Sequence, residues 1–126
     1  MKLESIQTDA APKAIGPYSQ AVAVGDWVFL SGQIPLDPAS GELVVGEFAA
    51  QARRALDNLD GVLRAAGCDR SRVVRVTCYL ADLSRFAELN QVYAEFFGGH
   101  RPARAVIGAA ALPRGAQVEI EATAVR

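Results

Sequence analysis

Two charged residues near the C-terminus, Arg104 and Glu119, are the strongest candidates for chemistry in this chain. Arg104 lies inside the apolar segment 103–107, where a guanidinium group needs water, an internal carboxylate or a bound anion. Glu119 lies in an alternating apolar and polar segment that follows. If the strands that carry them lie close together, the two side chains can frame one small site. The alternative is a structural ion pair at a subunit interface.

The sequence gives little support for a metal site, a serine nucleophile or a nucleotide-binding loop. The chain has one histidine, His100, and two cysteines, Cys68 and Cys78, which are too few and too widely spaced for a structural zinc site. We therefore expect no metal. Ser19 and Ser31 lie outside any G-x-S-x-G turn, and neither Gly-rich phosphate-binding motif occurs, so a serine triad and a nucleotide site are not favoured.

The composition narrows the class of protein. The chain has 126 residues, of which 51% are hydrophobic, so we expect one globular domain over residues 1–126. A formal net charge of −1 argues against a nucleic-acid partner. The sequence shows no secretory signal and no apolar run long enough for a membrane span, so we expect a cytoplasmic protein without membrane contact. Asp60 and Asp69 lie near the arginines of residues 64–75, which favours a solvated surface over a phosphate site.

The candidate residues must be positioned by elements that the hydrophobic pattern indicates. A helix over residues 48–66 follows from an apolar stripe at spacings of three and four, and a second helix over 84–97 from a similar stripe. Two apolar runs around Gly25-Asp26 predict a β-hairpin. The expected strands cover residues 2–8, 20–24, 27–33, 73–80, 103–109 and 117–125.

This order predicts a two-layer α/β (α+β) domain: a mixed sheet of about six strands with two helices on one face, because crossover connections are right-handed. The other face of the sheet then stays bare. With Trp27, Phe29, Val73 and Tyr79 available to it, that face would be a large exposed apolar patch, so we expect self-association and binding clefts between subunits.

Four segments in chain order resemble the RidA (YjgF-type) family of reactive-intermediate deaminases. They are Gly16-Pro17-Tyr18-Ser19-Gln20, Ser31-Gly32-Gln33-Ile34-Pro35, Leu89-Asn90-Gln91-Val92-Tyr93, and Pro102-Ala103-Arg104-Ala105-Val106-Ile107 with Val118-Glu119-Ile120-Glu121 after it. The resemblance runs from about residue 10 to the end of the chain without evident insertions.

This resemblance implies a chorismate-mutase-like homotrimer that hydrolyses 2-imino acids, such as 2-iminobutanoate and 2-iminopropanoate, to 2-keto acids and ammonia. It implies no metal and no cofactor. Arg104 matches the family's substrate-carboxylate arginine and Glu119 its acidic residue near the reacting carbon. The matching pocket positions are Tyr18, Ser31, Gly32 and Asn90.

One departure is visible at Val106, where family members often carry a cysteine, and we expect it to change substrate fit more than activity. Two other functions stay open at this point. One is a ligand-binding or regulatory module that uses the same clefts without turnover. The other is a ribonuclease acting on translation, which the charge and the single histidine disfavour. The sequence names neither the preferred imino acid nor the enzyme that makes it.

Overall fold

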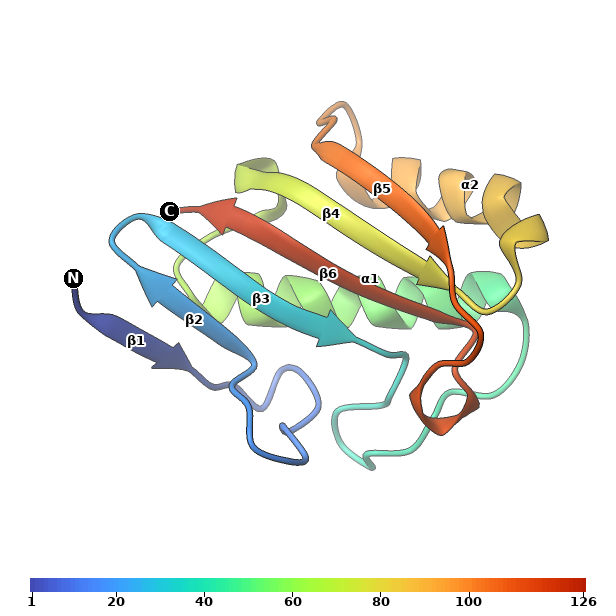
Figure 1. Ribbon diagram of the computed structural model, residues 1–126, viewed down its shortest axis with the longest axis horizontal. Coiled ribbons are helices and arrows are strands. Elements are labelled where there is room, and N and C mark those ends of the chain that lie inside the picture. The colour runs from blue at the N-terminus through green and yellow to red at the C-terminus, as the bar shows by residue number, and fades with distance from the viewer.

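Six strands form one mixed sheet in the order β1-β2-β3-β6-β4-β5 (Figure 1). Only β4 and β5 run parallel, and every other neighbouring pair is antiparallel. The computed structural model describes all residues, 1–126. Its strands are β1 (Leu3–Ile6), β2 (Ala21–Val24), β3 (Trp27–Gln33), β4 (Val73–Leu80), β5 (Ala103–Gly108) and β6 (Val118–Val125).

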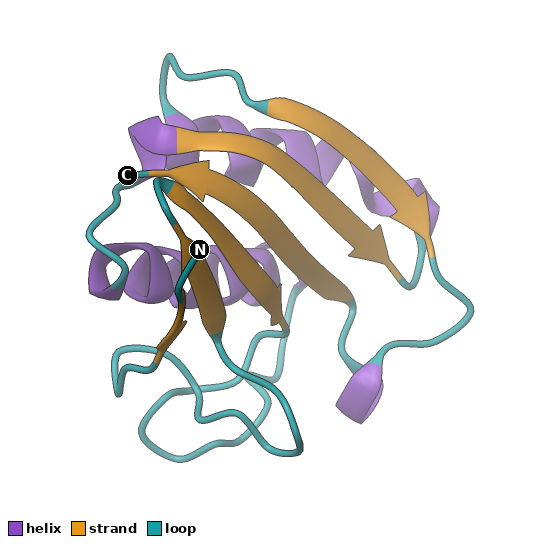
Figure 2. Ribbon diagram, turned by 60° about the vertical axis from the view of Figure 1, so that its left-hand side comes forward, coloured by secondary structure: helices purple, strands orange, loops and turns teal.

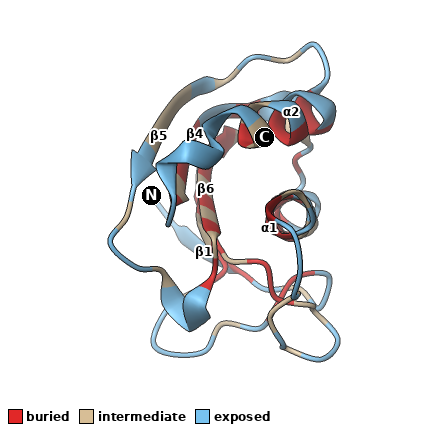
Figure 3. Cartoon of the chain, turned by 90° about the vertical axis from the view of Figure 1, so that its right-hand side faces the viewer, coloured by how far each residue is buried: buried red, intermediate tan, exposed pale blue.

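Two helices, α1 (Phe48–Ala65) and α2 (Phe86–Phe97), cover the same face of this sheet (Figure 3). Each helix lies in a crossover between strands that point the same way: α1 leads from β3 to β4, and α2 from β4 to β5. The view coloured by secondary structure shows the same two layers (Figure 2). The predicted two-layer α+β class, the six strands and the common helix face are all confirmed.

The core lies between the helices and the sheet. On α1 the residues that recur at helical spacing, including Ala52, Leu56, Leu59 and Leu63, are fully buried. They pack against the inward residues of β6, whose burial alternates strictly along the strand. The helix ends where Gly67 adopts a positive φ of 79°, a conformation that suits glycine.

The second helix begins two residues later than the sequence pattern indicates. Residues Leu83–Arg85 form a 3₁₀ turn, and the carboxylate of Asp82 accepts hydrogen bonds from the amide and hydroxyl groups of Ser84. The α-helix proper starts at Phe86. Asp82 therefore caps the short turn, which leads into the helix.

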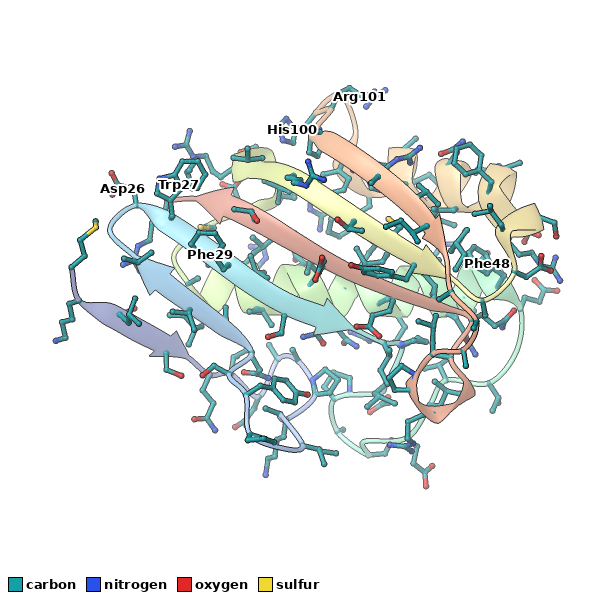
Figure 4. All side chains as sticks on the ribbon, in the orientation of Figure 1. Asp26, Trp27, Phe29, Phe48, His100 and Arg101 are labelled. Carbon is teal, nitrogen blue, oxygen red and sulfur yellow. The ribbon has the colours of Figure 1, made fainter.

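The face of the sheet away from the helices is uncovered in a single chain, as expected. Trp27 and Phe29 stand on it, and each is about half exposed (Figure 4). Val73 was expected there too, and this prediction is wrong, because Val73 is 2% exposed. The register of β4 shifts between Val73 and Arg75, which turns Val73 toward the helices together with Val76.

Candidate active site

Three loops meet at one end of the sheet and border an open cavity of about 490 Å³. They are the connections β1–β2, β3–α1 and β5–β6, which lie below the strands in Figure 1. The floor comes from the end of β3 and the start of β6. The lining residues are Pro12, Lys13, Ile15, Tyr18, Gln20, Ser31, Gly32, Gln33, Ile34, Leu36, Pro113, Arg114 and Glu119.

Polar side chains that are buried or half-buried hold these loops in place. The amide of Gln20 is buried: its Oε1 accepts from the Thr8 amide at 2.7 Å, and its Nε2 donates to the Pro12 carbonyl at 2.7 Å. The Ser31 hydroxyl donates to the carbonyl of Ser19 at 2.6 Å. Satisfied buried hydrogen bonds of this kind fix a loop in one conformation. Ser31 thus anchors the segment that carries Tyr18, which lies exposed at the cavity.

Gly32 and Glu119 lie in direct contact at the floor. The pairing of β3 with β6 is irregular between Leu30 and Gln33, so Gly32 sits in a bulge. A Cβ atom built on Gly32 would lie only 2.2 Å from Oε2 of Glu119. The missing side chain therefore makes room for the carboxylate.

A Gly32→Ala substitution should displace the Glu119 carboxylate. Because the obstructing atoms are the far end of a flexible side chain, the fold should tolerate the change, while a misplaced carboxylate should cost up to about 100-fold in kcat. Steady-state kinetics and a thermal melt on one preparation check this.

Gly99→Ala is the matched control, since Gly99 has no heavy atom within 4 Å of its Cβ position and no positive φ. Equal activity of the Gly32→Ala and Gly99→Ala proteins would show that the position of Glu119 does not matter.

The surroundings of Glu119 suit a proton acceptor, because they raise its pKa and provide no partner for its carboxylate. Burial raises its pKa above the ordinary value, and the charge of Glu121 raises it further. No hydrogen bond or ion pair within the chain satisfies its carboxylate, whereas Glu121 accepts a hydrogen bond from the hydroxyl of Tyr79 at 3.0 Å. Glu119 is thus free to act on a bound molecule.

Arg104 lies elsewhere. It pairs in register with the buried Val76, so its side chain points to the helix-covered side of β5, the edge strand of the sheet. There its Cζ atom lies 4.7 Å from the ring centroid of Tyr93 on α2. Asn90 shares the same stripe of α2 as Tyr93 and is partly buried. Asn90 therefore lies on the face of α2 that Tyr93 presents to Arg104.

Within one chain, Arg104 and Glu119 do not frame a common site. The condition set by the sequence, that their strands lie close together, is not met, because β4 separates β5 from β6. Two strand spacings separate β5 from β6 by about 10 Å. Arg104 and Glu119 are also three positions apart in register, and their side chains point to opposite faces. The structure brings together Tyr18, Ser31, Gly32 and Glu119, and places Arg104 and Asn90 apart from them.

Two cavity residues with charged side chains, Lys13 and Arg114, were not singled out from the sequence. Arg114 is the only residue other than glycine with a positive φ, 62°, in a 3₁₀ turn over Pro113–Gly115. The Pro113-Arg114-Gly115 run signals a turn but gives no sign that the turn closes a cavity. Lys13 lies in a loop whose fold depends on Gln20, a long-range contact that a local pattern does not reveal.

The remaining sequence candidates lie away from this cavity. His100 lies in the α2–β5 connection, at the other end of the sheet from the cavity loops (Figure 4), and its Nε2 lies 2.7 Å from the carbonyl oxygen of Val73. Cys68 and Cys78 are buried and free, as core thiols. No group of three or more His, Cys, Asp or Glu side chains comes together as a metal site would require. No helix of the fold has both the length and the apolar character needed to cross a membrane.

Comparison with known proteins decides the family. The family model described as Endoribonuclease L-PSP matches residues 8–126. The chain belongs to this family, the RidA (YjgF-type) family. It is 57% identical to Protein DfrA of Myxococcus xanthus over 99% of this chain and 97% of that protein. It is 53% identical to the 2-iminobutanoate/2-iminopropanoate deaminase of Mus musculus over 96% of this chain and 90% of that one.

The fold agrees equally well with a solved member of the family. The crystal structure of RidA from an Antarctic Psychrobacter species superposes with a TM-score of 0.94 at 45% identity, covering 98% of this chain and 99% of that one. The resemblance drawn from four short segments is thereby confirmed. Membership in the RidA family alone leaves the activity of this chain open, because the family model and the mouse protein carry different functional descriptions.

Proposed function

We propose that this RidA-family protein hydrolyses 2-imino acids to 2-keto acids and ammonia, at a site that two subunits complete. The observation that carries the proposal is a pair of unsatisfied groups. The guanidinium group of Arg104 makes no hydrogen bond or ion pair within the chain, and neither does the carboxylate of Glu119 in its cavity. An anion-binding fork and a proton acceptor are the two groups that hydrolysis of a small imino acid requires. The mouse relative's name supports this reaction.

The site is completed, in this proposal, when the β5 edge of one subunit meets the loop cavity of the next. Arg104 and Asn90 would then face Tyr18, Ser31, Gly32 and Glu119 of the partner. The uncovered sheet face with Trp27 and Phe29 supplies the apolar surface for such an assembly. A closed homotrimer of the chorismate-mutase-like kind satisfies this arrangement with three equivalent sites.

Light scattering should therefore give a mass of about 40 kDa in solution, three times the chain mass of 13.4 kDa. A stable monomer at micromolar concentration would end the proposal of a shared site, since one chain does not bring the two groups together.

The chemistry follows from the charges of the two groups. The guanidinium of Arg104 binds the substrate carboxylate with two N–H donors, which fixes the position of C2. Glu119 accepts a proton from a water molecule as that water forms a bond to C2 and the C=N electron pair moves to nitrogen. Glu119 passes this proton to the nitrogen, and a second proton moves to the nitrogen from the new hydroxyl group on C2. The C–N bond then breaks and ammonia leaves, while the C–O bond becomes the keto group. Conjugated imines already react with water, so positioning supplies much of the acceleration.

A trapping assay tests the proposed function. An amino-acid oxidase generates the imine in situ from 2-aminobutanoate, and semicarbazide competes for it. The protein should lower the amount of semicarbazone that forms from the imine and raise the initial rate at which 2-oxobutanoate is released. Binding of 2-oxobutanoate with no effect on trapping would favour the ligand-binding alternative.

The family model's name keeps the ribonuclease alternative testable. RNA affinity that falls steeply with salt, together with RNA cleavage lost in Glu119→Gln, would support it.

A further inference from the structure

We propose that Tyr93 and Phe86 are positioning residues, whose rings hold the guanidinium of Arg104 by its faces and leave its N–H edge free for a substrate carboxylate. The inference rests on the proposed function, because it assigns those donors to a 2-imino acid. It concerns two aromatic residues of α2 to which neither the charge pattern nor the family motif gives a role in binding.

The geometry of the guanidinium carries the argument. The Cζ atom of Arg104 lies 4.7 Å from the ring centroid of Tyr93 and 5.6 Å from that of Phe86. Both distances are within the roughly 6 Å over which a cation is attracted to the face of an aromatic ring. Phe86 lies on the apolar stripe of α2 with Leu89, Tyr93 and Phe96, yet the residue is 43% exposed. Its ring contacts Arg104 because α2 begins beside the sheet edge that β5 forms.

Rings and carboxylates use different parts of a guanidinium group. The five N–H donors of arginine point outward in the plane of the group, so a carboxylate binds at the edge, while aromatic rings attract the cation through their faces. An acidic partner would hold Arg104 equally well but would occupy the donors. Aromatic partners hold it without consuming any hydrogen-bonding capacity.

Another arginine that packs against an aromatic ring of α2 shows the contrast. Arg70 lies over the ring of Phe96 at 4.0 Å, but its donors are used: Nη1 donates to the Phe96 carbonyl at 2.8 Å, and Nη2 lies 3.5 Å from Asp60. Arg70 is thus a structural arginine whose N–H donors already have partners within the chain. Arg104 has the aromatic contact alone, which is what a ligand-binding arginine needs.

The ring of Tyr93, rather than its hydroxyl, makes this contact. Tyr93 is 7% exposed, and its hydroxyl is buried with no partner in the chain. A buried hydroxyl without a partner stabilises nothing. We call the two rings of Tyr93 and Phe86 around Arg104 the aromatic clamp. Tyr93→Phe should therefore keep this clamp, and Tyr93→Leu should remove one of its two rings.

The experiment measures KM and kcat for imine hydrolysis, and the affinity for 2-oxobutanoate, a stable carboxylate probe, by titration calorimetry. Tyr93→Leu and Phe86→Leu should each raise KM and the probe Kd roughly three- to thirtyfold, with a smaller change in kcat. Tyr93→Phe should stay within about twofold of wild type on both measurements, since the ring remains.

Phe96→Leu is the matched control, because it removes a buried ring of the same helix that contacts Arg70 rather than Arg104. It should lower the melting temperature and leave KM unchanged. If Tyr93→Leu fails to fold, Phe86→Leu still tests the clamp, because the Phe86 ring is partly exposed and its loss leaves no enclosed cavity.

The decisive comparison repeats Tyr93→Leu and Phe86→Leu in the Arg104→Ala background. A clamp that acts through Arg104 should cost nothing further there, whereas a general structural role should cost the same factor in both backgrounds. The inference would be overturned if Tyr93→Leu and Phe86→Leu raised KM by the same factor in the wild-type and Arg104→Ala backgrounds. It would also be overturned if Phe96→Leu raised KM as much as Tyr93→Leu and Phe86→Leu do. Wild-type protein that binds 2-oxobutanoate without hydrolysing imines would end the proposed function and leave the clamp standing. Wild-type protein that binds no carboxylate would overturn both.

Discussion

Arg104→Ala should lower kcat/KM for 2-iminobutanoate by about 30-fold to several thousand-fold. The carboxylate is the only permanent charge of such a substrate, so binding depends heavily on one charge-assisted pair. Truncating one partner of a desolvated pair costs roughly 2–5 kcal/mol, and each 1.4 kcal/mol is a factor of ten. Because Arg104 makes no ion pair in the chain, the loss should fall on the substrate and not on folding.

Arg104→Lys is the informative companion to Arg104→Ala. It keeps the positive charge and loses the planar fork, so it should recover only part of the activity. Light scattering should show the same assembly for both variants, since the rest of β5 keeps its pairing with β4. Initial rates over a range of imine concentrations give kcat and KM separately. If Arg104→Ala hydrolysed 2-iminopropanoate at the wild-type rate, Arg104 would not bind the substrate carboxylate, and its role would be structural.

The helices, the strands and their two-layer packing could be predicted from the sequence, because the signals for them are local. The apolar stripe of α1, the strict alternation of β6 and the Gly25-Asp26 turn each specify an element within a few residues. Val73 shows where local reasoning fails. An alternating pattern assigns it to the outer face, and only the pairing of β4 with β6 reveals the register shift that turns it inward.

The sequence proposed a set of candidate site residues, but it did not predict how they are arranged in space. Residue chemistry identified Arg104 and Glu119, and the resemblance added Tyr18, Ser31, Gly32 and Asn90. Their separation into two groups follows from the strand order, in which β4 lies between β6 and β5. Strand order depends on contacts between residues distant in the chain, which no local pattern encodes. The role of Gln20 in shaping the cavity was missed for the same reason.

The pH dependence of hydrolysis should identify Glu119 as the proton acceptor. Burial and then the charge of Glu121 raise the pKa of Glu119, so the active, ionised form is lost at a higher pH than for an ordinary glutamate. Activity should fall as the pH drops through that raised pKa. Glu121→Gln removes the like charge, lowers the pKa of Glu119 and should move the acid limb of the kcat profile to lower pH. An acid limb that Glu121→Gln leaves in place would assign it to another group.

Glu119→Gln should then lower kcat by roughly 100- to 10,000-fold, the range for loss of a general base. The amide keeps the shape of the side chain, so it should still fit beside Gly32, and the assembly should stay intact. The structural alternative makes the opposite prediction. An ion-pair partner would lose thermal stability on this change and keep its turnover, but Glu119 has no cationic partner within the chain. A melting temperature near that of wild type with kcat reduced at least 100-fold would establish the catalytic role. A lowered melting temperature with kcat unchanged would instead place Glu119 in an ion pair between subunits.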